Sequence, residues 1–114
     1  MFRGKTVAVI IPALDEEAAI GRVVGHLDRN VVDEVIVVDN GSRDRTAELA
    51  RSAGAEVLAE PRRGYGSACL RGIAATAAEL LVFMDGDGSD DASQLVELLT
   101  RLEDEGLDMV LGSR

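Results

Sequence analysis

The sequence predicts an α/β fold in which helices cover both faces of a mainly parallel sheet. Five short apolar runs alternate along the chain with four segments whose apolar residues recur at helical spacing. The runs are continuous rather than alternating, which is typical of strands that are buried on both faces. The connections are only a few residues long, so right-handed crossovers are expected. The 114 residues therefore fit one domain with the element order β-α-β-α-β-α-β-α-β.

The first strand is expected at Thr6–Ile11, a β-branched run (TVAVII) that Pro12 would end. An apolar stripe at helical spacing then predicts the first helix, and it consists of Ile20, Val23, Val24 and Leu27. Asp15, Glu16 and Glu17 precede this stripe. We expect these acidic residues in the first turn of the helix, where carboxylates interact favourably with the helix dipole.

The second strand is expected at Glu34–Val38 (EVIVV), and the polar turn after it leads into a second helix. Either Asp44 or Ser42 can cap that helix, because both side chains accept hydrogen bonds from the first free N–H groups. The helix is expected to run to Ala53 and to stop at Gly54.

The second half of the chain continues the alternation. A short third strand is expected at Glu56–Ala59, followed by a loop at Pro61–Gly66. The third helix is marked by Leu70, Ile73, Ala74 and Ala77. The fourth strand is expected at Leu80–Met84, and the fourth helix, which Gly106 would end, is marked by Ala92, Leu95, Leu99 and Leu102. A fifth strand is expected at Asp108–Leu111.

Charge and cysteine content exclude several classes of protein. The formal net charge of -9 argues against nonspecific nucleic-acid binding, which needs a basic surface. The single cysteine, Cys69, cannot form an intrachain disulfide and is consistent with a reducing cytoplasm. No apolar run has transmembrane length, and no signal peptide is expected at the N-terminus.

Polar turns follow three of the predicted strands. They read PALDEE after the first strand, DNGSRD after the second and DGDGSDD after the fourth. In open α/β sheets, ligands bind outside the carboxyl ends of the strands, where the strand order reverses. The three turns are therefore expected to meet at one ligand-binding edge.

The acidic turn Asp85–Asp87 allows two readings. It can belong to a solvated turn in which Asp90 or Asp91 caps the next helix. Alternatively, the two aspartates hold Mg²⁺ or Mn²⁺, with a diphosphate supplying further oxygen ligands. A calcium-binding EF-hand loop is excluded, because Asp90 stands where glycine is required and Val96 stands where glutamate is required.

Other ligand motifs fit poorly. Cys69 occupies the place of the third glycine that a dinucleotide fingerprint would need after RRGYG, and the only lysine is Lys5, so no P-loop is present. A receiver domain would need a lysine after the fifth strand. Arg62 and Arg63 lie either in a solvated loop or next to a diphosphate at the start of the third helix. One histidine, His26, gives no defensible Ser-His-Asp or Cys-His arrangement.

Five segments occur together in a recognisable order: VAVIIPALDEEAAIGRVV, VIVVDNGSRDRTAELA, RRGYGSACLRGI, LLVFMDGDGSDD and MVLGSR. In combination they resemble the family 2 glycosyltransferases, and most of all the branch of dolichyl- and polyprenyl-phosphate sugar transferases. The resemblance implies a Rossmann-like GT-A fold, a three-layer α/β/α sandwich. It also implies the parallel strand order 3-2-1-4, with the fifth strand at the end.

The resemblance implies a metal-dependent enzyme that transfers a sugar from a UDP- or GDP-linked donor to an acceptor, such as a polyprenyl phosphate. The Asp-x-Asp pair, Asp85 and Asp87, would hold Mg²⁺ or Mn²⁺, with Asp87 as the direct ligand. The implied nucleotide-sugar-binding residues are Pro12, Ala13, Leu14, Glu16, Asp39, Asn40, Arg63, Gly64, Asp85, Gly86, Asp87 and Arg114. A cytoplasmic location, peripheral at the inner membrane face, would suit a lipid-phosphate acceptor.

Residues 1–114 match the nucleotide-sugar-binding half of such a domain. We therefore expect an acceptor-binding half to be missing and the exposed sheet edge to support homo-oligomers. Two alternatives stay open: a donor-binding fragment without transfer activity of its own, or a non-catalytic nucleotide-binding or interaction module.

Overall fold

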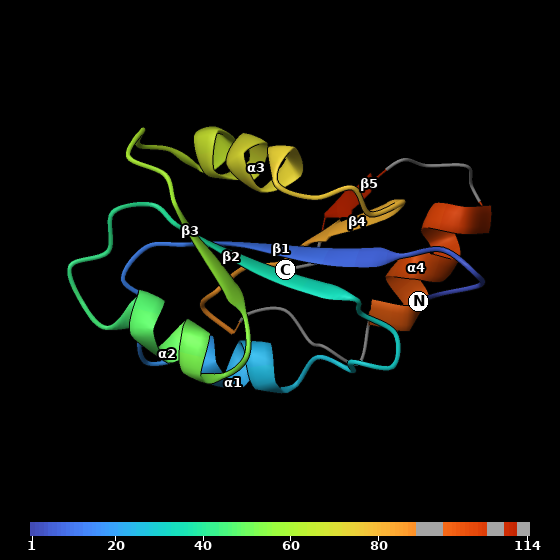
Figure 1. Cartoon of the computed structure of the whole chain (residues 1–114), viewed down its shortest axis with the longest axis horizontal. Helices are drawn as coiled ribbons and strands as arrows, with labels where there is room; N and C mark the ends of the chain where they lie inside the picture. The colour runs from blue at the N-terminus through green and yellow to red at the C-terminus, as the bar shows by residue number, and fades with distance from the viewer. Residues whose placement is uncertain (89–94, 105–108, 112–114) are drawn as a thin grey trace.

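A parallel five-stranded sheet forms the centre of the computed structural model, which describes residues 1–88, 95–104 and 109–111 (Figure 1). The elements are β1 Val7–Ala13, α1 Ile20–Gly25, β2 Glu34–Asp39, α2 Thr46–Ser52, β3 Glu56–Ala59, α3 Tyr65–Ala74, β4 Leu80–Phe83, α4 Leu95–Asp104 and β5 Met109–Leu111. The strand order is β3-β2-β1-β4-β5 and every pair is parallel. The predicted fold class and strand order are confirmed.

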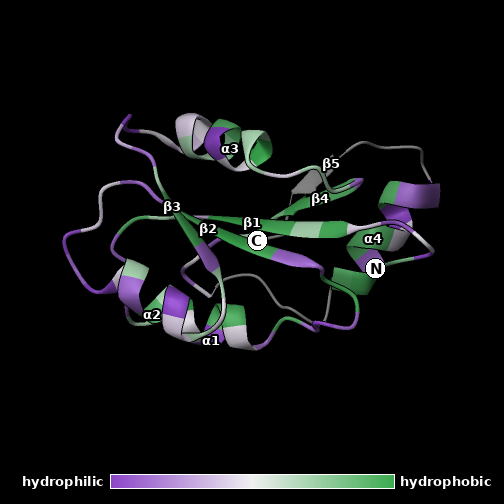
Figure 2. Ribbon diagram, in the orientation of Figure 1, coloured by the Kyte–Doolittle hydropathy of each residue, from purple (hydrophilic) through white to green (hydrophobic). Residues whose placement is uncertain are grey.

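Helices cover both faces of the sheet, as the sequence predicts. In Figure 1, α3 lies on one face and α1 and α2 lie on the other. The side chains of β1 alternate between these faces: Val9 and Ile11 pack into the core that α1, α2 and α4 share, whereas Ile10 packs with Ala68 of α3 and Phe83 of β4. Figure 2 shows hydrophobic residues concentrated in the central strands. Within the described residues, no helix is both long enough and apolar enough to cross a bilayer.

The expectation that Pro12 ends the first strand is wrong, because β1 continues through Pro12 to Ala13. The Ala13 carbonyl accepts a hydrogen bond from the Asn40 N–H on the β2 side, at 2.9 Å, and the Ile10 carbonyl accepts one from the Met84 N–H on the β4 side, at 3.0 Å. Alternate residues of a parallel strand face alternate neighbours. The nitrogen of Pro12 therefore faces the β4 side, where pairing with β4 ends at Ile10. The missing N–H leaves the pairing of β1 with β2 intact, and this pairing continues to Ala13.

The acidic residues expected in the first turn of α1 lie before the helix instead. The helix begins at Ile20, and its first turn contains no acidic residue. Asp15 has a positive φ of 54°, which a helix does not allow. Leu27 lies beyond the end of α1, although it is buried as the apolar stripe predicts.

The predicted apolar stripe of α3 is only partly correct. Leu70 is 68% exposed, and the buried positions of the helix are Ala68 and Gly72. A Cβ atom at Gly72 would lie 2.5 Å from Cγ2 of Ile10 on β1. The helix thus approaches the sheet too closely for large side chains on its inner face, so the small residues face the core and Leu70 faces solvent.

The remaining boundaries agree with the predicted ones to within a few residues. α2 ends at Ser52, one residue earlier than expected, and Gly54 follows with a φ of 102°. The stripe of α4 is confirmed in Leu95, Leu99 and Leu102, which are buried. Several residues named above lie outside the described residues: Asp90, Asp91, Ala92, Gly106, Asp108 and Arg114.

Candidate functional site

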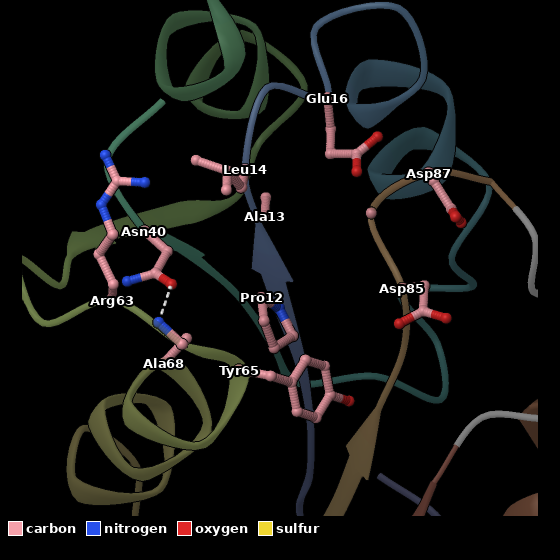
Figure 3. Close-up of a pocket in the computed structure, with 12 residues that line it drawn as sticks. Pro12, Ala13, Leu14, Glu16, Asn40, Arg63, Tyr65, Ala68, Asp85 and Asp87 are labelled. Carbon is pink, nitrogen blue, oxygen red and sulfur yellow. Dashed lines mark hydrogen bonds between the residues drawn. The ribbon is translucent and has the colours of Figure 1, made fainter. Parts of the chain in front are cut away.

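A cavity of about 320 Å³ lies at the carboxyl ends of β1, β2 and β4 (Figure 3). Its lining residues come from the turns after these strands and from the start of α3, and they are Pro12, Ala13, Leu14, Glu16, Asn40, Arg63, Gly64, Tyr65, Ala68, Asp85, Gly86 and Asp87. The predicted site residues thus meet at one cavity, apart from two. Asp39 does not line it, and Arg114 lies outside the described residues.

The two sides of the cavity differ in chemistry. Figure 3 shows Glu16, Asp85 and Asp87 on one side and Asn40 and Arg63 on the other. We call the first side the acidic end and the second side, which Leu14 and Gly64 complete, the Arg63 end. A ligand that spans the cavity would therefore meet carboxylates at one end and amide, guanidinium and apolar groups at the other.

The loop that carries Glu16 is held by the start of α2. The Glu16 N–H donates to Thr46 Oγ1 at 2.8 Å, and Thr46 is completely buried. The Thr46 hydroxyl in turn donates to the Asp44 carboxylate, which also accepts the Thr46 N–H at 2.9 Å. The N-cap position of α2 is Arg45, whose side chain makes no capping hydrogen bond, so neither Asp44 nor Ser42 is the N-cap residue that the sequence predicts. Asp44 lies one residue earlier and binds the first N–H of the helix.

The neighbouring acidic residues complete a reciprocal set of contacts between the same two loops. The Asp15 N–H donates to Ser42 Oγ at 2.9 Å, while the Asp15 carboxylate accepts the Arg43 N–H at 2.8 Å. The Glu17 carboxylate accepts the Arg45 N–H at 3.1 Å. These carboxylates accept hydrogen bonds from backbone N–H groups of another loop instead of interacting with the dipole of α1. This agrees with their position outside that helix.

Asn40 holds the loop at the Arg63 end. Its carboxamide nitrogen donates to the carbonyls of Glu60, at 2.9 Å, and Arg62, at 2.7 Å, and its Oδ1 accepts the Gly64 N–H at 3.0 Å. Gly64 has a φ of 119°, a conformation that L side chains rarely adopt. Both amide donors of Asn40 are thus committed to the chain, which limits the nucleotide-sugar-binding role that the resemblance implies for this side chain.

Asp39 also makes a contact within the chain. Its carboxylate accepts the Ser42 N–H at 2.9 Å and so closes the turn after β2. Asp39 is thus engaged within its own turn and is not among the lining residues.

Burial raises the pKa of Glu16 above its ordinary value, and the nearby charges of Asp87, Asp44, Asp85 and Asp15 raise it further. The acidic end therefore concentrates negative charge that would be relieved by a bound cation. Within residues 1–88, 95–104 and 109–111, no three His, Cys, Asp or Glu side chains are grouped so that they alone could hold a metal ion. A cation here would need oxygen ligands from a substrate or from water.

The turn between the two aspartates is tightly packed. A Cβ atom at Gly86 would lie 3.4 Å from Ala13 Cβ, Glu16 Cγ and Ile11 Cγ2. At Gly88, with a φ of 83°, a Cβ atom would lie 2.8 Å from Nη2 of Arg22. The chain thus places a guanidinium of α1 against the acidic turn, which offsets part of its charge.

Replacing Glu16 with Gln is expected to stabilise the protein at pH 7 in the absence of divalent cations. A carboxyl group whose pKa is raised by folding disfavours the folded state when it is ionised, and this penalty is absent below the ordinary value of 4.5, where both states are protonated. The gain should be less than about 1 kcal/mol, because the side chain is partly solvated. Thermal unfolding in EDTA at pH 7 and pH 4 measures it; an equal gain at both pH values would contradict the electrostatic cause.

Tyr65 and Ala68 line the cavity but are not among the predicted residues. Tyr65 is the first residue of α3 and is 47% exposed, and Figure 3 shows its ring below Pro12. One signal in the sequence does point to it, since the only tyrosine of the chain directly follows Arg63 and Gly64.

Comparisons with known proteins identify relatives over almost the whole chain. A family model described as glycosyl transferase family 2 matches residues 8–114. An uncharacterized glycosyltransferase of Mycobacterium tuberculosis is 40% identical over 111 residues, which are 97% of this chain and 50% of the relative. Protein RfbJ of Shigella flexneri is 36% identical over 115 residues, covering 100% of this chain and 89% of the relative.

A solved structure is similar in both sequence and fold. Glucosyl-3-phosphoglycerate synthase from Mycobacterium tuberculosis, in complex with Mn²⁺, uridine-diphosphate-glucose and phosphoglyceric acid, matches with a TM-score of 0.79 and 35% identity. The match covers 87% of this chain and 39% of that one. The chain spans about half the length of the first curated relatives it matches.

Proposed function

Since the chain belongs to glycosyl transferase family 2, we propose that it binds a uridine-diphosphate sugar together with Mn²⁺ or Mg²⁺ for transfer of the sugar to an acceptor that carries a phosphate group. The observation that carries this proposal is the two-sided cavity at the carboxyl ends of the strands. A nucleotide sugar has the matching polarity, with a base and ribose at one end and a diphosphate at the other. Residues 1–114 would be the nucleotide-sugar-binding portion of the protein.

The acidic end fits a hard divalent cation. Asp85 and Asp87 offer carboxylate oxygens from one turn, and such ions commonly combine one or two carboxylates with substrate phosphates. When bound, the cation would neutralise the charge that develops on the leaving diphosphate. The implied role of Arg114 in nucleotide-sugar binding stays a prediction.

At the Arg63 end, the apolar surface of Leu14 and the backbone of Ala13 and Gly64 would receive the base and ribose. Uridine is favoured over guanosine because related structures were solved with uridine diphosphate or uridine-diphosphate-glucose. Mn²⁺ is present in these complexes, and Mg²⁺ in another with uridine diphosphate.

The acceptor class is proposed from the relatives. Phosphoglyceric acid is bound in a related structure, so a small phosphorylated acid is the first acceptor to test. A polyprenyl phosphate, with a cytoplasmic enzyme peripheral to the inner membrane face, remains the prediction from the resemblance. Self-association through the sheet edge also remains a prediction.

Calorimetric titration with UDP-glucose and GDP-mannose, in Mn²⁺ and in EDTA, tests the donor site. We expect UDP-glucose to bind at least about tenfold more tightly in Mn²⁺ than in EDTA, and more tightly than GDP-mannose. An affinity that is independent of the metal would overturn the proposed cation role.

A second candidate function is donor binding without transfer by this chain alone, which its coverage of half of the mycobacterial relative's length favours. The two are separated by incubating the chain with UDP-glucose, Mn²⁺ and either phosphoglyceric acid or a short polyprenyl phosphate. Release of uridine diphosphate that requires an acceptor supports transfer, whereas binding without release supports the second candidate.

A further inference from the structure

Within the part of the chain that the structure describes, the buried polar or charged side chains are Asn40 and Thr46. Each one anchors a different loop of the cavity. We propose that they are positioning residues with separate tasks: Asn40 fixes the Arg63 end for the nucleoside, and Thr46 fixes the acidic end for the cation. This inference rests on the proposed function and adds to it the residues that hold each end of the donor site in place.

The Asn40 carboxamide makes a complete set of hydrogen bonds. One carboxamide bonds to three successive points of the loop that precedes α3, at Glu60, Arg62 and Gly64. A buried polar group persists only when its hydrogen bonds are made, and here the bonds link the end of β2 directly to the loop. Arg63 lies between two of the anchored residues, so its backbone cannot shift without breaking them.

An aspartate at position 40 would have the same size but could not make the same hydrogen bonds to the loop. It keeps an acceptor for the Gly64 N–H, yet it has no donor for the two carbonyls that the Asn40 nitrogen now contacts. Two carbonyl oxygens would then face a carboxylate oxygen inside the protein, and the loop would move away.

Thr46 links the loop that carries Glu16 to the turn that carries Asp44. Its hydroxyl accepts the Glu16 N–H and donates to Asp44, so it uses both capacities of the group while fully buried. The Glu16 side chain in turn packs beside Gly86, where a Cβ atom would lie 3.4 Å from Glu16 Cγ. A displaced Glu16 would therefore disturb the turn that carries Asp85 and Asp87.

Among the described residues, the side-chain hydrogen bonds of the two anchors share no partner: the loop held by Asn40 spans residues 60–64, and the loop held by Thr46 is at Glu16. Groups without shared partners tend to act independently. If each anchor positions one end of the donor, the two variants should fail in different ways. A purely structural role would instead weaken both ends together.

The experiment uses two probes and matched variants. Uridine monophosphate in EDTA reports the nucleoside end, and the ratio of uridine diphosphate affinities in Mn²⁺ and in EDTA reports the cation end. Asn40→Asp should weaken uridine monophosphate about tenfold and leave the Mn²⁺ ratio within about twofold. Thr46→Val should lower the Mn²⁺ ratio about tenfold and leave the affinity for uridine monophosphate within about twofold. Thr46→Ser, which keeps the hydroxyl, should retain the wild-type ratio.

Other outcomes decide against the proposal. Equal losses in both measurements for both variants, or no loss in either, would overturn it. If Asn40→Asp does not fold in a thermal melt, Asn40→Ser removes the contacts without burying a charge, and Thr46→Ala serves in the same way for Thr46→Val. Failure of the wild-type chain to bind either probe would overturn the proposed function itself, which distinguishes the two failures.

Discussion

Asp87→Asn is expected to remove most of the Mn²⁺ contribution to UDP-glucose binding, a loss of at least about tenfold in affinity, with a similar loss in any transfer reaction. The carboxamide has the shape of the carboxylate but lacks its charge, and a hard divalent cation needs that charge to bind at a site with so few protein ligands. Calorimetric titration in Mn²⁺ measures the loss. Binding in EDTA should change little, because Asp87 lies on the side of the cavity opposite Arg63 (Figure 3).

The same substitution removes one of the charges that raise the pKa of Glu16 by like-charge repulsion. Asp104→Asn is the matched control, since it makes the same chemical change in an exposed pair with Arg3, far along the chain on α4. If the control lost affinity as Asp87→Asn does, or if Asp87→Asn retained the full effect of Mn²⁺, the proposed cation site would be wrong.

Gly72→Ala is expected to destabilise the protein by about 1–3 kcal/mol. The added methyl group would start 2.5 Å from Cγ2 of Ile10, which is a branched, fully buried side chain of the central strand and has no room to turn away. The strain outweighs the gain of up to about 1 kcal/mol in helix propensity that the same change gives elsewhere. Chemical denaturation measures the free energy of unfolding.

Gly66→Ala is the control in the same helix. A Cβ atom there has nothing within 4 Å, so the substitution should be neutral or stabilising by up to about 1 kcal/mol. Equal stabilities of the two variants would show that α3 does not approach β1 as closely as the structure has it.

The site was predictable from the sequence to the extent that it depends on where strands end. Pro12, Asp39 and Asp85 each follow a continuous apolar run, and parallel strands with short crossovers bring such positions to one edge. The resemblance to family 2 glycosyltransferases supplied Arg63 and Gly64, which no periodicity would have selected. Tyr65 was missed because it is the first residue of a helix that was expected to begin later.

The sequence by itself determined the fold class and the edge at which the cavity forms, because apolar periodicity and short connections leave few ways to bury these strands. The strand order was implied by the resemblance to family 2 glycosyltransferases. Only the tertiary structure decided what individual side chains do there. Asp15 and Glu17 bond to a loop about 28 positions away in sequence, and Asn40 bonds to one 20 or more positions away. The inner face of α3 likewise depends on how closely its backbone approaches Ile10. Such contacts join residues far apart in the chain, so no local pattern of residue types encodes them.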